Sequence, residues 1–342
     1  MANVVVYLLN KTRPLKWLIV SLCVLANAAH SEWHSDQQGI MGTDINVQLW
    51  HEDARIGKQA VAAVMEEMRR IDRTLSPYID SSELANTNLL AAQKPVTLSP
   101  EFTMLIDKSL YFSQVTGGAF DITFASIGQH YDYRDKKKPS TKLSESLKGA
   151  IDYHHLQFNK KTRTLSFKHP DVKIDLGGIA KGYAVDQAIE IAKSLGVKHA
   201  SIGAGGDTRL LGDRRGRPWI LGVKNPRIDE GDDRGKPSVL TLPLSNVAIS
   251  TSGDYERFFI DPTTGERIHH IINPKTGRSA SGIISASVLG PNSIDTDALS
   301  TSVFVLGVKR GLALINRLNG FDCVIIDEFG KVHYSQGLAP PQ

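Results

Sequence analysis

Cysteine is almost absent from this chain of 342 residues, which contains only Cys23 and Cys323. Cys23 lies in an N-terminal segment that we expect to be removed, so Cys323 would remain alone and no intramolecular disulfide can form. Because Cys323 opens a short apolar run, it is most simply a residue of the hydrophobic core. The sequence also lacks the CxxC, HExxH, GxSxG and Rossmann patterns, so none of these common motifs assigns a function.

Excess charge and long apolar runs are lacking as well. The formal net charge is +4, and three positive charges belong to the N-terminal segment: Lys11, Arg13 and Lys16. The mature chain would therefore carry a net charge of about +1, too small an excess for a dedicated nucleic-acid-binding protein. The apolar stretch at residues 17–25 is shorter than a transmembrane helix requires.

Residues 1–28 have the features of a secretory signal peptide. Basic residues precede the apolar stretch, and Ala26-Asn27-Ala28 matches the small-x-small pattern of signal cleavage. Leu22, immediately before Cys23, is bulky where lipoprotein signals usually carry a small residue. We therefore expect export to the periplasm and a mature chain of residues 29–342. Association with the inner membrane through an uncleaved segment is the alternative.

The remaining composition is that of an ordinary globular protein, with 41% hydrophobic and 22% charged residues. Apolar spacing and capping residues predict helices over 54–75, from 99 onward, from 183 to 196, over 295–306 and over 309–318. Strands are predicted in a hairpin within 155–168, in a final hairpin around 328–331, and at 200–203, 219–223, 239–242, 248–250, 256–260, 268–272 and 284–289. Because helices and strands are mixed without regular alternation, we expect a single large α+β domain with mixed or antiparallel sheets and packed helices.

Residues 175–186 form the most informative segment, Asp-Leu-Gly-Gly-Ile-Ala-Lys-Gly-Tyr-Ala-Val-Asp. Glycines at a strand-to-helix junction allow a ligand to approach closely, and a helix N-terminus presents free N–H groups to an anion. The glycine spacing is not that of the Walker pattern, and the serine or threonine of that pattern is missing. The segment therefore predicts an anionic ligand near a helix start, with a tight turn that only glycine can form as the simpler alternative.

Asp297 and Thr301 are four residues apart near the start of a predicted helix, so both side chains point to one side, with Ser300 close to that face. Carboxylate and hydroxyl oxygens are hard ligands of the kind that Mg²⁺ prefers, and phosphates can complete the shell. The alternative is that these residues only cap the helix, which is their commoner use.

His269 and His270 lie in the predicted strand 268–272, so their side chains should point to opposite faces. One of them could be a general base, because imidazole titrates near neutral pH; a packed or solvated histidine is the alternative. Three further segments with glycines or hydroxyls, at 116–123, 205–207 and 250–254, could bind a ligand or merely turn the chain. These residues together predict an exported α+β protein with an anionic, metal-assisted ligand site.

Taken together, these segments resemble the ApbE family of FAD:protein FMN transferases. Each matching block is short, but the blocks occur in family order and span nearly the whole mature chain, which makes the series specific. They are residues 41–43, 75–78, 82–84 with Asn88, 116–123, 175–186, 205–207, 250–255, 269–277 and 297–301. Asn273 departs from the aspartate of many members, although both side chains form the same turn hydrogen bond.

The resemblance implies the ApbE (T-fold-like) architecture and an enzyme that uses Mg²⁺ to cleave the pyrophosphate of its substrate FAD. It would join FMN through a phosphoester bond to a threonine or serine of a target protein and release AMP. The implied partners are flavin-accepting subunits of membrane redox complexes of the Na⁺-translocating NADH:quinone oxidoreductase or Rnf type. Two alternatives stay open: a periplasmic FAD pyrophosphatase that releases free FMN, and a flavin-binding or storage protein.

The resemblance also implies roles for single residues, carried over position by position. His270 matches the base proposed for the family. The metal is expected between the Gly178 carbonyl, Asp297 and Thr301, with Ser300 at the edge of the site. Contacts with FAD are expected from Met41, Tyr78, Ala119, Phe120, Asp121, Asp175, Lys181 and the backbone near Ile272.

Overall fold

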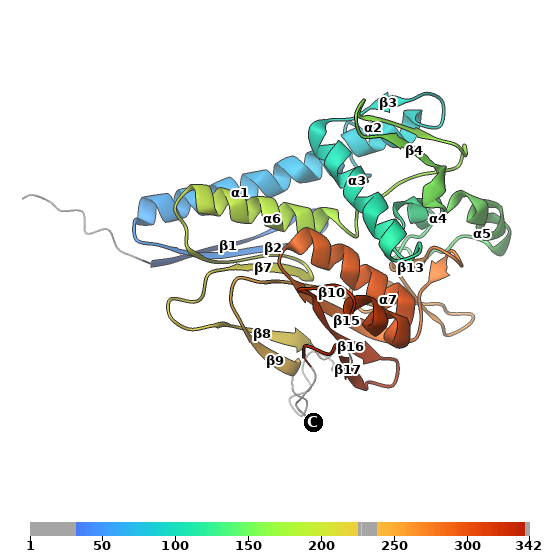
Figure 1. Cartoon of the computed structure of the whole chain (residues 1–342). Coiled ribbons are helices and arrows are strands. Elements are labelled where there is room, and N and C mark those ends of the chain that lie inside the picture. Colours follow the sequence, from blue (N-terminus) through green and yellow to red (C-terminus); the bar gives the residue numbers. More distant parts are fainter. Residues whose placement is uncertain (1–31, 225–226, 228–237, 339–342) are drawn as a thin grey trace, which may run out of the picture.

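A computed structural model describes residues 32–224, 227 and 238–338 of the chain (Figure 1). The predicted signal peptide, residues 1–28, lies outside the described residues, so its presence and cleavage stay a prediction. Within the described residues, helices and antiparallel sheets pack as one α+β domain, which confirms the fold class predicted from the sequence.

An eight-stranded sheet forms the centre of the domain. Its order is β1-β2-β6-β7-β10-β15-β16-β17, and neighbouring strands are antiparallel throughout. The strands are β1 (Glu32–Ile40), β2 (Thr43–His51), β6 (His199–Ala204), β7 (Asp207–Leu211), β10 (Ala248–Gly253), β15 (Ile283–Gly290), β16 (Asp322–Asp327) and β17 (Val332–Tyr334). All eight residues of β15 are buried, so both faces of the sheet are covered there.

The hairpin β1–β2 has no counterpart among the strands predicted from the sequence. β2 alternates, with Ile45, Val47 and Leu49 buried against the core. β1 is an edge strand with few apolar residues, so it lacks the pattern that reveals a half-buried strand. The turn between them, Met41-Gly42, has φ of 56° and 67°, as a two-residue type I′ turn requires.

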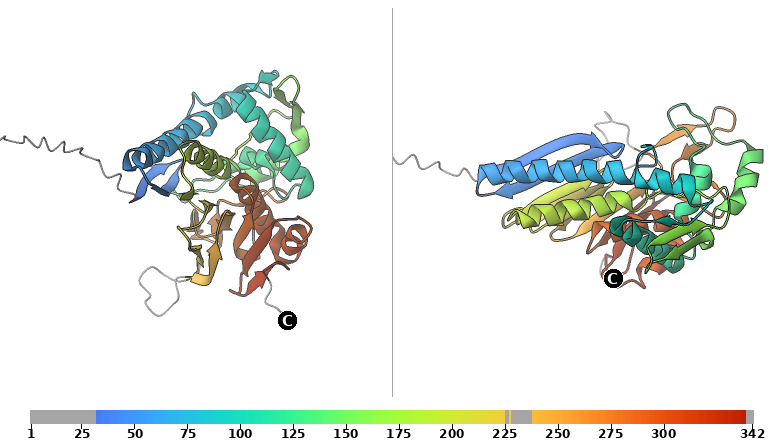
Figure 2. Two further views of the ribbon diagram at one scale, coloured as in Figure 1. Left: turned by 60° about the vertical axis from the view of Figure 1, so that its left-hand side comes forward. Right: turned by 90° about the horizontal axis from the view of Figure 1, so that it is seen from above.

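Three helices cover one face of the sheet: α1 (Ala54–Leu75), α6 (Ala180–Ser194) and α7 (Ser293–Ile315). Figures 1 and 2 show α1 and α6 side by side along the sheet, with α7 next to α6. α1 begins at Asp53, whose carboxylate accepts the N–H groups of Arg55 and Ile56. α6 ends before Gly196, which has φ of 83° and closes the helix as the sequence predicts.

α7 contains the helix predicted at 295–306 and most of the one predicted at 309–318, but it ends at Ile315. Gly307, with φ of 75° and ψ of 175°, interrupts it between the two predicted segments. Among the described residues α7 is the one helix long and apolar enough to span a membrane, and 56% of its apolar window is buried inside the protein. Its packing against β10, β15 and α6 identifies it as a core helix.

A smaller region, coloured from cyan to green in Figure 1, packs beside α1 and α7. α3 begins at Ser99-Pro100-Glu101 as predicted, with the Ser99 hydroxyl accepting a backbone N–H. The predicted hairpin within 155–168 is β4–β5. The region consists of α2 (Glu83–Leu90), α3 (Pro100–Val115), α4 (Ala125–Gly128), α5 (Thr141–Leu147), β3 (Val96–Thr97), β4 (Leu156–Asn159) and β5 (Thr164–Phe167).

Two-stranded pairs complete the described part of the chain: β8 (Trp219–Lys224) with β9 (Ser238–Leu244), β11 (Phe258–Ile260) with β12 (Arg267–His269), and β13 (Ile272–Asn273) with β14 (Arg278–Ser279). Trp33 of β1 meets Trp219 edge-on, with ring centroids 5.4 Å apart, so β8 packs directly against β1. The single strand predicted over 268–272 is wrong. The chain leaves the ladder at His270 and Ile271, and β12 and β13 pair with different strands.

Candidate active site

The candidate site lies at one end of the large sheet, where the turns after β1 and β6 meet the end of β10. Gly205 and Gly206 form the turn after β6. A side chain on Gly205 would come within 2.5 Å of Thr43 Oγ1, and one on Gly206 within 2.4 Å of the Thr251 carbonyl oxygen. Because only glycine lacks the clashing Cβ atom, these residues allow the three segments to pack closely.

The glycine-rich segment 175–186 leads into α6 and packs against the start of α7. Gly182 lies in the first turn of α6, and a Cβ atom there would be 2.2 Å from the Ser293 carbonyl oxygen. Asp186 accepts the N–H groups of Ser293 and Ile294, each at 2.9 Å, with its two carboxylate oxygens. A carboxylate at a helix N-terminus is stabilised by the free N–H groups and the helix dipole. The segment therefore sets the position of the α7 residues that follow.

Two carboxylates and one ammonium group form the charged centre of the site. Lys181 Nζ lies 2.9 Å from Asp207 Oδ2 and 3.6 Å from Asp297 Oδ1, and it donates to the Gly177 carbonyl oxygen at 3.3 Å. The second Asp297 oxygen accepts the Gly182 N–H at 2.9 Å. Both carboxylates are almost completely buried, so their charges are poorly screened by water.

Burial and neighbouring charges act against each other in this centre. Burial raises the pKa of Asp297 and the Asp207 charge adds to this, while Lys181 opposes it. Burial lowers the pKa of Lys181, but the attraction of Asp207 and Asp297 outweighs it, and the net pKa is raised. The ammonium group therefore stays protonated at neutral pH, and the centre stabilises positive charge.

Hydroxyl groups converge beside the carboxylates. Ser252 Oγ lies 2.9 Å from Ser300 Oγ and 3.2 Å from Thr301 Oγ1. Ser300 also donates to the Asp297 carbonyl oxygen of its own helix at 2.9 Å. A Cβ atom on Gly178 would be 3.4 Å from Thr301 Oγ1, which places the backbone of the glycine-rich segment against this hydroxyl. The four residues that were expected around a metal therefore lie together.

The chemistry of these donors fits a hard divalent cation. The Asp297 carboxylate, the Thr301 hydroxyl and the Gly178 carbonyl are oxygen ligands of the type that Mg²⁺ accepts. Within the described ranges, no three His, Cys, Asp or Glu side chains cluster as a site built from those residues alone would need. A metal here would therefore depend on hydroxyl and backbone oxygens in addition to a carboxylate.

The two adjacent histidines have different surroundings. His269 is buried, its Nε2 lies 2.8 Å from the Ala280 carbonyl oxygen, and its Nδ1 accepts the Ile271 N–H at 3.3 Å. The fold therefore occupies both of its nitrogens. His270 Nδ1 is buried and has no hydrogen-bond partner in the described part of the chain. Burial and then the Arg257 charge lower the pKa of His270 to about 3, so at neutral pH its imidazole is an uncharged base.

Several residues that were expected to contact FAD lie around Arg257. Arg257 Nη2 donates to the Gly42 carbonyl oxygen at 2.8 Å, next to Met41 in its left-handed conformation. A bulky residue with positive φ is unusual and often marks a functional site. Tyr78 is 85% exposed in the loop between α1 and α2, and Arg257 lies within electrostatic range of both Tyr78 and Asp175. These side chains border one side of the site.

Phe120 and Asp121 form part of the wall. A Cβ atom on Gly178 would be 3.2 Å from the Phe120 ring, so the ring lies against the glycine-rich segment. Asp121 is buried and accepts the Thr123 N–H at 2.8 Å, the Thr123 hydroxyl at 2.6 Å and the Tyr153 N–H at 2.9 Å. Its carboxylate therefore fixes the conformation of this loop. A ligand at this position would contact the backbone or a remaining lone pair of a carboxylate oxygen.

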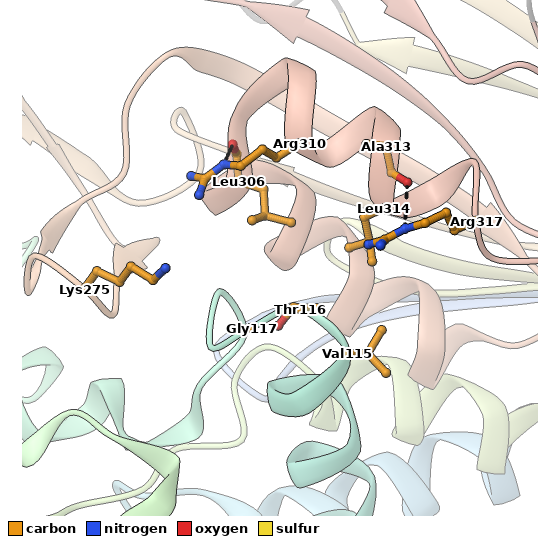
Figure 3. Close-up of a pocket in the computed structure, with 9 residues that line it drawn as sticks. All are labelled: Val115, Thr116, Gly117, Lys275, Leu306, Arg310, Ala313, Leu314 and Arg317. Carbon is orange, nitrogen blue, oxygen red and sulfur yellow. Dashed lines mark hydrogen bonds between the residues drawn. The ribbon is translucent and has the colours of Figure 1, made fainter.

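Ala119 and Ile272 lie on a further side of the site. The Ile272 side chain packs with Ile127 and Ile151, and its backbone pairs with Ser279 of β14, so a contact with FAD stays a prediction. Ala119 and Asn273 line a narrow recess. The recess adjoins a cavity of about 380 Å³ between the end of α3, the β13–β14 turn and the second half of α7 (Figure 3).

Three residues of the site were absent from the predicted set: Asp207, Ser252 and Arg257. Asp207 and Ser252 belong to segments that the sequence marked as ligand-binding loops or simple turns. Their convergence with Asp297 could not be recognised, because the three segments lie far apart along the chain. Arg257 follows no motif, and its position beside the Met41-Gly42 turn depends on tertiary packing alone.

Comparison with known proteins agrees with this architecture. Residues 41–325 match the model of the ApbE family. The FAD:protein FMN transferase of Haemophilus influenzae is 31% identical over 261 residues, 74% of each chain. That of Vibrio cholerae is 26% identical over 339 residues, 95% of this chain and 98% of its own. The crystal structure of the ApbE protein from Thermotoga maritima is similar, with a TM-score of 0.81 at 31% sequence identity. The structure of the flavin transferase ApbE from Vibrio cholerae has a TM-score of 0.77 at 26% identity. Each comparison covers 90% of this chain and 98% of the other chain.

The antiparallel sheet with its helical layer, and the buried carboxylates and hydroxyls at one end of it, are thus the architecture of a transferase. The chain belongs to the ApbE family. The family and the fold inferred from the ordered sequence blocks are confirmed.

Proposed function

We propose that this protein is a Mg²⁺-dependent FAD:protein FMN transferase, which attaches FMN to a threonine or serine of a target protein and releases AMP. The observation that carries the proposal is the buried centre in which Asp297, Asp207 and Lys181 meet the hydroxyls of Ser300 and Thr301. Such a centre suits a pyrophosphate and a cation. Relatives that match most of the chain are named FAD:protein FMN transferases, which supports the same activity here.

The cation would be held by Asp297, Thr301 and the Gly178 carbonyl, with Ser300 at the edge, and would stabilise negative charge on the reacting phosphates. Lys181 lies against both carboxylates and is protonated, so it can also donate to a phosphate of FAD. Gly178 directly precedes α6 and Lys181 lies in its first turn, and a helix N-terminus favours anions; Asp297, Ser300 and Thr301 lie in the second and third turns of α7.

His270 would act on the acceptor. It takes the proton of the threonine or serine hydroxyl, whose oxygen forms a bond to the phosphorus of the FMN half of FAD. The bond from that phosphorus to the bridging oxygen breaks, and AMP leaves with that oxygen. His270 is suited to this role because its Nδ1 has no hydrogen-bond partner in the described residues, whereas both nitrogens of His269 are occupied.

The flavin would lie between the Met41 turn and Tyr78, with Asp175 beside its ribityl arm. A largely exposed aromatic ring such as Tyr78 can stack on a flavin without first breaking protein contacts. We further propose that the chain is exported to the periplasm; retention at the inner membrane through an uncleaved signal is the alternative. Its partners would be flavin-accepting subunits of membrane redox complexes.

A FAD pyrophosphatase with the same pocket is the second candidate, since water could replace the acceptor hydroxyl. A flavin-storage protein is less well supported, because binding alone requires neither a histidine such as His270, whose Nδ1 has no partner in the described ranges, nor a converging set of hydroxyls.

The test is to incubate residues 29–342 with FAD, Mg²⁺ and the isolated flavin-accepting domain of a redox subunit, and to search by mass spectrometry for FMN on a threonine or serine. Asp297→Ala should abolish transfer. Asp295→Asn is the matched control, because Asp295 is on the same helix but pairs with Lys108 outside the centre. Free FMN and AMP without an adduct would favour the pyrophosphatase, unchanged FAD would favour storage, and full activity of Asp297→Ala would contradict the metal site.

A further inference from the structure

The cavity of about 380 Å³ beside the site is open and lies between three elements (Figure 3). One side is the end of α3 with Gly117, another is the β13–β14 turn with Lys275, and the third is the second half of α7. The recess lined by Ala119 and Asn273 adjoins it and shares Lys275 with it. Ala119 directly precedes the Phe120 ring that lies against the glycine-rich segment, so the cavity extends outward from the candidate active site.

The rim of the cavity is positively charged. Lys275, Arg310 and Arg317 are exposed, and no carboxylate within the described ranges forms an ion pair with any of them. Arg310 Nε donates to the Leu306 carbonyl oxygen at 3.3 Å, and Arg317 Nε donates to the Ala313 carbonyl oxygen at 3.2 Å. Arg310 lies in α7 and Arg317 two residues beyond its end, and both bonds involve only Nε, so the terminal nitrogens have no partner among the described residues. Guanidinium groups with free terminal nitrogens bind carboxylates in a bidentate manner.

The floor of the cavity has a different character from its rim. Val115, Leu306 and Leu314 contribute apolar surface, and Leu314 is buried. A cationic rim above an apolar floor suits a segment that carries both acidic and apolar side chains, because each kind of side chain then meets a complementary surface. A free phosphate has no apolar part to bury against this floor.

We infer that this cavity is the docking site for an acidic segment of the acceptor protein, near the residue that receives FMN. The inference rests on the proposed function, because it identifies how the protein substrate of that reaction is recognised. Carboxylates of the segment pair with Arg310, Arg317 and Lys275, and its apolar side chains contact Leu306 and Val115. Binding there holds the acceptor hydroxyl near the site, which lowers KM for the acceptor without changing the chemistry at the phosphorus.

Charge reversal of the rim tests the inference. Arg310→Glu/Arg317→Glu is compared with Arg55→Glu/Lys58→Glu, which changes the net charge equally near the N-terminus of α1, where acidic residues are tolerated. The probe is a fluorescein-labelled dodecapeptide in which Asp and Glu alternate with Leu, Gly and one Thr. A second peptide has Asn and Gln in place of the acids. Kd is measured by fluorescence anisotropy with the full mature chain, and KM and kcat for transfer to the acceptor domain are measured in parallel.

We expect Arg310→Glu/Arg317→Glu to weaken binding of the acidic peptide by about 10-fold or more. For the wild-type protein, Kd should rise with salt, because salt screens the attraction between the rim and the peptide. The α1 variant should stay within about two-fold of wild type, since it leaves the rim unchanged. KM for the acceptor should rise while kcat and KM for FAD stay unchanged.

Equal affinity for the acidic and amide peptides, or equal Kd in the two double variants, would overturn the inference. Displacement of the peptide by AMP, together with a raised KM for FAD in Arg310→Glu/Arg317→Glu, would assign the cavity to the nucleotide instead. A wild-type protein that forms no FMN adduct would refute the proposed function, while the peptide measurements would still decide whether the cavity binds acidic segments. Normal adduct formation with unchanged acceptor KM in the rim variant would refute the docking site alone.

Discussion

Gly182→Ala perturbs the contact between α6 and α7 at the centre of the site. The added Cβ atom would lie 2.2 Å from the Ser293 carbonyl oxygen and 2.8 Å from Asp297 Cβ, and real Cβ atoms do not approach other atoms within 3.0 Å. The two helices must therefore move apart by about 0.8 Å, and overpacking of this kind costs about 1–3 kcal/mol. The move also stretches the 2.9 Å hydrogen bond from the Gly182 N–H to the Asp297 carboxylate.

The expected loss of stability is modest, while the expected loss of activity is large. At about 2–4 °C per kcal/mol, the melting temperature should fall by roughly 2–12 °C, so the protein remains folded at 25 °C. Displacement of Asp297 relative to Gly178 and Thr301 by nearly 1 Å should lower kcat by about 10²-fold, because catalysis depends on the exact placement of the reacting groups.

Thermal melting followed by circular dichroism and FMN transfer at saturating FAD and Mg²⁺ provide the two readouts. Gly149→Ala is the matched control, because a Cβ atom on Gly149 meets nothing within 4 Å. The reasoning would be refuted if Gly182→Ala melted and turned over like Gly149→Ala.

Three further predictions concern charges and protons. Asp207→Asn should raise the Mg²⁺ concentration for half-maximal transfer by about 10–100-fold, because mutation of residues that support a metal ligand typically weakens metal binding by this amount. At saturating Mg²⁺, kcat should be retained, and an unchanged Mg²⁺ titration would contradict the prediction. His270→Gln should lower transfer by about 10²–10⁴-fold without changing the Kd for FAD, and wild-type activity should show no loss from His270 protonation between about pH 5 and 8. The folded pKa of His270, about 3, lies below its unfolded value of 6.5, so between these two pH values His270 gains a proton only in the unfolded chain. Stability should therefore fall as pH decreases from about 6.5 to 3, and less steeply in His270→Gln, as measured by urea unfolding. Hydrogen bonds from Arg70 and Tyr183 lower the pKa of Glu101, although burial opposes them. The Glu101 carboxylate therefore stabilises the fold above its unfolded pKa of 4.5, and this contribution declines as the pH falls below that value. Glu101→Gln should cost about 1 kcal/mol at pH 7 and progressively less as the pH falls below 4.5; an equal cost at pH 7 and at pH 3 would show that the ion pair is not responsible.

Most of the secondary structure could be predicted because its signals are local. The apolar spacing of α1, the Ser99-Pro100-Glu101 start of α3, the end of α6 at Gly196 and the two halves of α7 all agree with the structure. The β1–β2 hairpin was missed, because edge strand β1 is polar and its turn places a methionine at positive φ instead of the usual Asn-Gly.

The break in the strand predicted over 268–272 could not be read from the sequence, since residues 268–272 are apolar or histidine throughout. Pairing decides it: β12 pairs with β11, whereas β13 pairs with β14, and the chain must leave the first ladder to reach the second. The consequence for function is direct, because His270 lies in that break.

The family, the α+β class and the short blocks that hold the site residues can be recognised from the sequence alone, because motifs and helical periodicity are properties of neighbouring residues. Packing in three dimensions fixes which of two adjacent histidines has a ring nitrogen without a partner among the described residues, and it brings Asp207 and Ser252 together with Asp297, Ser300 and Thr301. Burial, hydrogen-bond partners and pKa depend on segments that are distant along the chain and meet only when the sheet and its helices have packed.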